Sequence, residues 1–140
     1  MSVEFPFTGA AIADASTELP LFREYAWDFK SNTFKRDANG CRIVVEGDEA
    51  LKVWVFKALQ TERYQYLAYS WRYGIELKPF IGLVMTVKER MSELKRVIVE
   101  CLMVNPYVRS IDSVTFENDG DTLHAVISLT TVYGEVIINV

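Results

Sequence analysis

The sequence predicts a single small α+β domain with an N-terminal β-hairpin, two main helices and a C-terminal antiparallel sheet. Three observations support this fold class. Two segments, beginning near residues 47 and 86, carry apolar residues at helical spacing, and the last third of the chain alternates apolar and polar residues at period two. Turn-forming residues separate the alternating runs. At 140 residues, 50% of them hydrophobic, the chain is long enough to bury a core.

The composition excludes several classes of protein. The net charge of -4 and the pI of about 5.0 argue against a general nucleic-acid or anionic-membrane binder, because such proteins need a basic surface. The longest apolar run, residues 80–85, is too short to span a bilayer, and no secretory signal is expected. Cys41 and Cys101 form no CxxC motif, so a reduced, cytoplasmic protein with two ordinary thiols is expected.

The N-terminal third predicts an arm followed by a hairpin. Residues 1–20 are rich in small residues and show no helical or strand period, so we expect an arm that orders on a partner or on the domain, or a terminus without order. The domain is expected to span residues 21–140. Residues 25–46 indicate a hairpin, because residues 37–40, Asp-Ala-Asn-Gly, are strong turn formers. Its return strand is expected to be half-buried.

The first helix is predicted to begin after Gly47. Asp48 and Glu49 are favourable in a first turn, and the apolar residues that follow make a face wide enough to be covered on more than one side. Residues 75–85, further along the chain, are expected to form a loop or a short helix.

The second helix is the clearest element in the chain. It is predicted to begin at Thr86 and to stop at Asn105-Pro106. Its predicted inner stripe consists of Val87, Met91, Leu94, Ile98, Cys101 and Leu102.

The last third predicts three strands. Residues 107–117 form the first, with a bulge near residues 112–113 where the alternation shifts register. Residues 118–121 are a hairpin turn, residues 123–130 alternate cleanly, and residues 135–140 make a final short strand.

The connection after the first helix, residues 61–74, is rich in aromatic residues and arginine. These residue types anchor protein interfaces, because they supply large contact area at little rotamer entropy. Two alternatives stay open: the rings line one core-facing strand edge, or they face a partner. The aromatic residues are Tyr64, Tyr66, Tyr69, Trp71 and Tyr73.

The sequence contains no pattern of catalytic, metal-binding or cofactor-binding residues. His124 lies on the outward face of a predicted strand, without the further ligands that a metal needs. Cys101 lies on an apolar helix stripe, where cysteine usually fills the core. Two carboxylate clusters, at residues 46–49 and 117–121, are explained by a helix start and a turn better than by a glycosidase pair. The residues therefore indicate binding rather than catalysis.

An ordered set of residues resembles a known family. It consists of Thr61-Glu62-Arg63, Tyr69, residues 73–77, the long second helix, Asn105-Pro106 and the C-terminal hairpin. Over residues 21–140 these features resemble the baseplate wedge proteins of contractile phage tails, in the PBSX-prophage-type branch found in Gram-positive phages and R-type bacteriocins. That branch includes the sheath-initiator subunit once labelled a tail lysozyme.

The resemblance implies a structural protein that forms the platform for the first sheath ring. The family carries a Glu-Pro-Arg or similar motif at residues 61–63, implicated in contact with the wedge bundle. This chain lacks the proline; Arg63 carries over directly, and Glu62 carries over with a register shift of one residue. The wedge contacts that the resemblance implies are Glu62, Arg63, Tyr69 and Tyr73. Sheath subunits link by exchanging terminal strands, so the implied sheath contacts are Gly134, Glu135, Val136, Ile137, Ile138, Asn139 and Val140.

The implied partners are other baseplate wedge proteins and the tail sheath protein, with tube or hub proteins as further candidates and several copies in a symmetric ring. No cofactor, nucleic acid or membrane is implied, and the expected location is the baseplate of a tail particle made in the host cytoplasm. Two alternatives remain: a peptidoglycan hydrolase using Glu46 or Asp48, and an assembly factor absent from the finished particle. Deleting residues 134–140 is expected to stop sheath assembly and leave the domain folded. Arg63→Ala is expected to weaken wedge binding more than stability.

Overall fold

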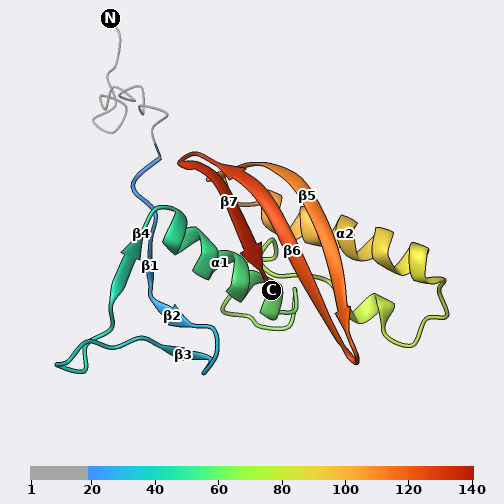
Figure 1. The fold of residues 1–140 in the computed structure, drawn as a ribbon, viewed down its shortest axis with the longest axis horizontal. Coiled ribbons are helices and arrows are strands. Elements are labelled where there is room, and N and C mark those ends of the chain that lie inside the picture. Colours follow the sequence, from blue (N-terminus) through green and yellow to red (C-terminus); the bar gives the residue numbers. More distant parts are fainter. Residues whose placement is uncertain (1–18) are drawn as a thin grey trace, which may run out of the picture.

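Two helices cover one face of a three-stranded antiparallel sheet, and a smaller set of paired strands precedes them (Figure 1). This computed structural model describes residues 19–140, so the predicted arm lies outside the described residues except for its last two. The α+β class is as predicted. The elements in chain order are β1 (Arg23–Tyr25), β2 (Trp27–Asp28), β3 (Thr33–Phe34), β4 (Val44–Glu46), α1 (Asp48–Gln60), the 3₁₀ helix η1 (Lys78–Phe80), α2 (Val87–Met103), β5 (Val108–Asp119), β6 (Thr122–Thr131) and β7 (Gly134–Asn139).

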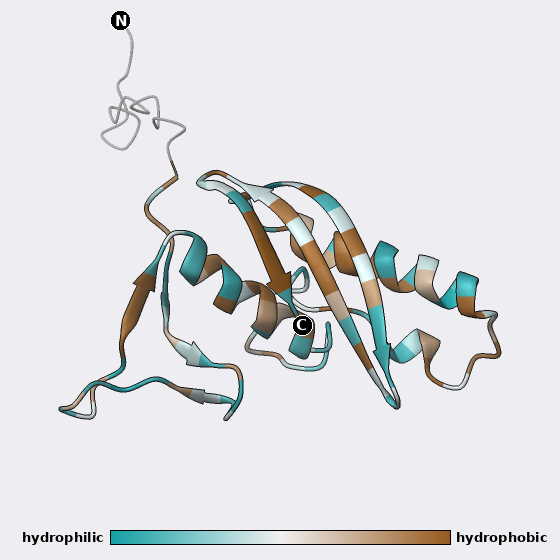
Figure 2. Cartoon of the chain, viewed as in Figure 1, coloured by the Kyte–Doolittle hydropathy of each residue, from teal (hydrophilic) through white to brown (hydrophobic). Residues whose placement is uncertain are grey.

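The core lies between the sheet and the two helices. Bands of apolar and polar residues follow one another along β5 and β6 (Figure 2), and the buried apolar side chains of the sheet pack in one cluster with those of the helices. The buried cluster contains Val55 and Ala58 from α1, Val97, Ile98, Cys101 and Leu102 from α2, and Val108, Val114, Ala125, Ile127, Leu129, Val136 and Ile138 from the sheet.

The C-terminal sheet follows the predicted plan closely. The strand order is β5-β6-β7, with both pairs antiparallel. The register of β5 against β6 shifts twice, once between Val108 and Ser110 and once between Ile111 and Ser113, which confirms the predicted bulge. Asp119 pairs with Thr122, so the turn between these strands is shorter than predicted.

The N-terminal strands pair antiparallel, as two short sheets rather than one continuous hairpin. β1 pairs with β4, and β2 pairs with β3. The two sheets meet at a triangle of backbone hydrogen bonds. Ala26 N–H donates to the Ile43 carbonyl (2.7 Å), Lys35 N–H to the Ala26 carbonyl (2.9 Å) and Ile43 N–H to the Lys35 carbonyl (3.2 Å). The return strand is more exposed than predicted: on the face expected to be buried, Ile43 is 39% exposed, Cys41 is exposed and Val45 is half-buried.

Helix α1 is enclosed on more than one side, as its wide apolar face predicted. It contacts β1 and β4 on one side and α2 and β7 on the other (Figure 1). At its first turn Asp48 Oδ1 accepts a hydrogen bond from the Thr131 hydroxyl (2.8 Å), which ties the helix to the β6–β7 turn. None of the helices in residues 19–140 has the length and apolar character needed to cross a membrane.

Helix α2 begins with a capping box. Thr86 Oγ1 accepts from Glu89 N–H (3.3 Å), and Glu89 Oε2 accepts from Thr86 N–H (3.0 Å). The second half of α2 supplies the buried residues, whereas its first turns extend past β5 (Figure 1). Val87 was predicted to face inwards, and this prediction is wrong: it is 73% exposed, because nothing in the described part of the chain buries it.

Candidate docking surfaces

The aromatic-rich connection is a loop whose two ends are joined by backbone hydrogen bonds. Arg63 N–H donates to the Ile75 carbonyl (2.9 Å), and Ile75 N–H donates to the Thr61 carbonyl (2.9 Å). Gly74, at φ +101°, is buried at this junction. A loop with closed ends holds its tip in a defined position without regular secondary structure. We call residues 64–73 the aromatic loop.

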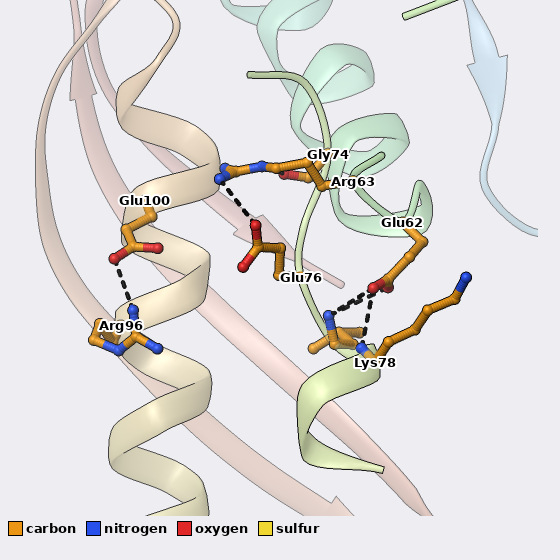
Figure 3. Close-up of polar contacts among 8 residues, drawn as sticks. Glu62, Arg63, Gly74, Glu76, Lys78, Arg96 and Glu100 are labelled. Atoms are coloured by element: carbon orange, nitrogen blue, oxygen red, sulfur yellow. Dashed lines mark hydrogen bonds and ion pairs between the residues drawn. The ribbon is translucent and has the colours of Figure 1, made fainter. Parts of the chain in front are cut away.

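Glu62 binds the segment that follows the loop (Figure 3). Its carboxylate accepts hydrogen bonds from the backbone N–H groups of Leu77 (3.2 Å) and Lys78 (3.0 Å). These N–H groups lie at the start of η1, where amide donors have no intrahelical partner. The side chain of Glu62 therefore ties the loop base to η1.

Arg63 also points into its own chain (Figure 3). Its Nε–H donates to the Gly74 carbonyl (3.2 Å), and its guanidinium lies 3.7 Å from a carboxylate oxygen of Glu76. The side chain is only 13% exposed. Both predicted motif residues thus hold the base of the aromatic loop from within.

The aromatic loop presents its rings outwards. Tyr69 is 48% exposed and Trp71 is 82% exposed. Ring pairs brace the loop, with centroids of Tyr69 and Tyr73 4.8 Å apart and those of Tyr64 and Trp71 6.4 Å apart. The rings and Leu67 enclose a hollow of about 370 Å³. Four further residues of the loop are exposed and lie outside the wedge contacts that the resemblance implied: Tyr64, Tyr66, Leu67 and Trp71.

Tyr73 differs from the other rings, because it packs against the core beside Trp54 (centroids 6.1 Å apart). Burial raises the pKa of its phenol above the ordinary value. Burial therefore separates the rings of the loop into two groups. Tyr73 is mainly a packing residue, and the remaining tyrosines of the loop with Trp71 are available for contact.

Strand β7 has one edge without a neighbouring strand among residues 19–140. Ala125 and Val140 exchange both backbone hydrogen bonds (2.8 and 2.9 Å). Hydrogen-bonded pairs alternate along an antiparallel ladder, so the backbone groups of Glu135, Ile137 and Asn139 point away from β6. We call the N–H and C=O groups of these three residues the β7 edge.

The other side chains of the predicted sheath contact are part of the core. Val136 and Ile138 are 5% and 6% exposed and lie in the buried cluster. From the structure we now expect deletion of residues 134–140 to unfold the domain, contrary to the expectation from sequence, because the deletion would remove this core surface together with a whole strand.

The groups considered for catalysis have structural partners. Asp48 binds Thr131, and Glu46 pairs with Arg23 (2.9 Å) at the surface. Burial raises the pKa of Cys101 to about 12, so its thiol stays protonated near neutral pH. Among the described residues, no cluster of three or more His, Cys, Asp or Glu could hold a metal ion. The geometry favours surfaces for binding other proteins.

Comparison with known proteins shows the family of this chain. Residues 23–134 match the family described as contractile injection system sheath initiator. The chain is also similar to the phage-like element PBSX protein XkdS of Bacillus subtilis (strain 168), with 34% identity over 98 residues, covering 67% of this chain and 70% of that protein. The family is a structural one, so the chain acts in starting the sheath of a contractile tail and contacts other tail components such as the sheath. The chain therefore belongs to the sheath initiator family of contractile injection systems.

Proposed function

We propose that this protein joins the baseplate wedge to the first sheath ring, and that a strand of the sheath protein adds to the β7 edge. The observation that carries the proposal is the row of outward backbone groups at Glu135, Ile137 and Asn139. An edge of this kind accepts an extended chain through main-chain hydrogen bonds, and alternate side chains set its register. Ile137 offers an exposed apolar side chain at the middle of the edge, with 66% exposure.

The opposite edge of the sheet is less suited to this contact. β5 carries two register shifts, and bulges of this kind disrupt the regular spacing that an incoming strand needs. β7 pairs with β6 in unbroken register from Gly134 to Asn139. The regular strand therefore supports β7 as the acceptor.

We assign the wedge contact to the aromatic loop. Trp and Tyr are the residue types that dominate binding energy at interfaces, and here they are exposed on a loop with a fixed base. In this proposal Glu62 and Arg63 position the loop, while Tyr69 and its exposed neighbours touch the partner. Tyr73 supports them from the core side.

The proposed location is the baseplate, with several copies of the folded region, residues 21–140, arranged in a ring. Each single strand contact is weak, but linked contacts around a ring strengthen one another through effective concentration. Assembly on a preformed ring thus explains how a short edge starts a sheath.

The substitution Ile137→Pro tests the strand addition. Proline removes the outward N–H and leaves the bonds to β6 in place, and edge strands tolerate proline where the N–H faces solvent. We expect tails with this variant in the baseplate and no sheath, seen by electron microscopy and by mass spectrometry of purified particles. The matched variant Ile137→Thr keeps the N–H and a β-branched side chain, so it should retain sheaths.

Full sheaths on particles that carry folded Ile137→Pro would refute strand addition at this edge. Thermal unfolding of the purified variant establishes that it is folded. Ile138→Pro is the contrasting case, because it removes a bond to β6 and disturbs a core residue, and it should unfold the domain.

A further inference from the structure

A groove with aromatic walls lies between the N-terminal strands, α1 and the aromatic loop. Its volume is about 400 Å³, which is within the range of pockets that bind small ligands or side chains. Its lining includes the polar residues Asn32 and Gln60. The residues that form its walls are Trp27, Phe34, Phe56, Lys57, Tyr69 and Tyr73.

One wall of the groove contains a polar group without a partner. Trp27 Nε1 is buried and has no hydrogen-bond acceptor among the described residues. The Lys57 ammonium lies 5.3 Å from the ring centre of Trp27 and 5.0 Å from that of Phe34. Aromatic faces with an indole N–H donor are the features that bind extended, proline-containing peptides, whose carbonyl groups accept the hydrogen bond.

The N-terminal strands on one side of the groove carry a net positive charge. Residues 26–43 carry four basic residues, Lys30, Lys35, Arg36 and Arg42, and two acidic residues, Asp28 and Asp37, which gives a side-chain charge of 4 − 2 = +2. Residues 1–18 carry Glu4, Asp14 and Glu18 and no lysine or arginine, which gives a side-chain charge of −3. These residues also contain the sequence Phe5-Pro6-Phe7. The charges and the aromatic–proline–aromatic sequence complement the groove.

The attachment point of residues 1–18 lies within reach of the groove. Tyr107 donates to the Pro20 carbonyl, Phe22 N–H donates to the Tyr133 hydroxyl (3.0 Å), and Gly47 N–H donates to the Phe22 carbonyl (2.9 Å). From Gly47 to Lys57 the helix rises about 15 Å. An extended chain from residue 19 back to residue 7 spans roughly 40 Å. This length exceeds the rise along α1, so residues 5–7 can reach the groove.

We propose that residues 1–18 bind this groove of their own chain, with Phe5-Pro6-Phe7 against the aromatic wall and a backbone carbonyl accepting the Trp27 indole N–H. The occupied groove joins the N-terminal segment to Tyr69 and so to the aromatic loop. Tyr69 is also assigned to the proposed wedge contact, so the two contacts share this ring, whereas the contact proposed for the sheath lies on β7.

A spin label on Cys41 tests the proposal in the full chain. Cys41 is exposed, whereas Cys101 is buried with a pKa of about 12, so a thiol-reactive nitroxide modifies Cys41 alone. Its neighbour Arg42 lies 4.4 Å from the ring centre of Phe34, a wall of the groove. We expect the label to broaden the NMR signals of residues 5–7 in the same molecule.

A mixed sample shows whether the segment that occupies the groove comes from the same chain or from a second chain. Isotope-labelled chains without nitroxide are mixed with nitroxide-labelled chains that are invisible to NMR. The proposal is supported if the NMR signals of residues 5–7 broaden when isotope and nitroxide are on the same chain and do not broaden in the mixture. Broadening in the mixture, or none in either sample, overturns it.

The double substitution Phe5→Ala and Phe7→Ala provides a second test. The experiment uses the isotope-labelled full chain, in which the variant Trp27→Phe identifies the NMR signal of the Trp27 indole N–H. This signal should move upfield in the double variant, because its hydrogen bond is lost. The indole signals of Trp54 and Trp71 should stay in place. Ile12→Ala is the matched control, because it removes an apolar side chain elsewhere in the same segment. A Trp27 signal that does not move, or that moves equally with Ile12→Ala, refutes the proposal.

Discussion

The backbone carbonyl of Thr61 lies 2.7 Å from the point that a Cβ atom on residue 74 would occupy, and only glycine fits there. The same point is 3.0 Å from the Arg63 nitrogen. Gly74 thus lets the two ends of the aromatic loop approach closely enough for the bonds between Thr61, Arg63 and Ile75 to form. The exposed rings of the loop depend on this one close approach.

Gly74→Ala should destabilise the protein by about 2–4 kcal/mol, because the methyl group collides with backbone atoms and the residue keeps a positive φ. Urea denaturation of the purified chain measures the change. Gly82→Ala is the control: Gly82 also has a positive φ (+82°), but nothing lies within 4 Å of its added Cβ. Equal losses for the two variants would show that the close contact at residue 74 is unimportant.

Arg63→Ala should lower the free energy of unfolding by about 1–3 kcal/mol, since a largely buried guanidinium loses its bond to the Gly74 carbonyl and its pairing with Glu76. This revises the expectation from sequence that partner binding would suffer more than stability. Arg72→Ala is the matched variant, because Arg72 is exposed and makes no ion pair within residues 19–140. If both arginine variants unfold at the same urea concentration as the unmodified chain, Arg63 has no structural function at the loop base.

Trp71→Ala should weaken binding to isolated wedge complexes by about 2 kcal/mol or more, as expected for an aromatic hot spot. Stability should change by no more than about 0.5 kcal/mol, because the side chain is 82% exposed. Calorimetric titration measures the affinity. Val84→Ala, at a fully exposed site outside the loop, should leave binding unchanged. Unchanged affinity with Trp71→Ala would remove the aromatic loop from the wedge interface.

Cys101 should resist thiol reagents in the folded protein. With a pKa of about 12, only about one thiol in ten thousand is ionised at pH 8. In a Cys41→Ser variant, labelling by a disulfide reagent should be slow in buffer and fast in urea, as followed by absorbance. Rapid labelling under native conditions would contradict the buried position of Cys101.

The same thiol predicts the direction of an alkaline effect on stability. Burial raises its folded pKa from 9.0 to about 12, so between these values the unfolded chain loses a proton that the folded chain keeps. The folded state then binds more protons, and the free energy of unfolding falls as pH rises through this window. Denaturation curves at increasing pH check the sign, and Cys101→Val should reduce the slope.

The strands and helices of the second half were predictable because local patterns carry them. The capping box at Thr86 and Glu89, the stop at Asn105 and the alternation around Ile127 each act over a few residues. The exposure of the first turn of α2 was not predictable in this way. Val87 continues the helical stripe in sequence, yet among residues 19–140 nothing buries it.

The candidate site shows the same division between local and long-range information. Aromatic composition, a local property, pointed to residues 61–74 as a candidate partner contact, and the family resemblance together with strand alternation pointed to residues 134–140. Which side chains face a partner depended on distant neighbours. Glu62 turns towards Leu77, fifteen positions away, and Arg63 towards Gly74, eleven positions away.

The sequence by itself determined the α+β class, the order of the main elements and the absence of a recognisable catalytic pattern. Tertiary structure alone decided that Glu62 and Arg63 hold the loop, that Tyr73 packs against the core and that Ile138 is buried where Ile137 is exposed. The physical reason is that hydrophobic periodicity and capping depend on near neighbours in the chain. Burial and hydrogen-bond partners depend on which segments pack together.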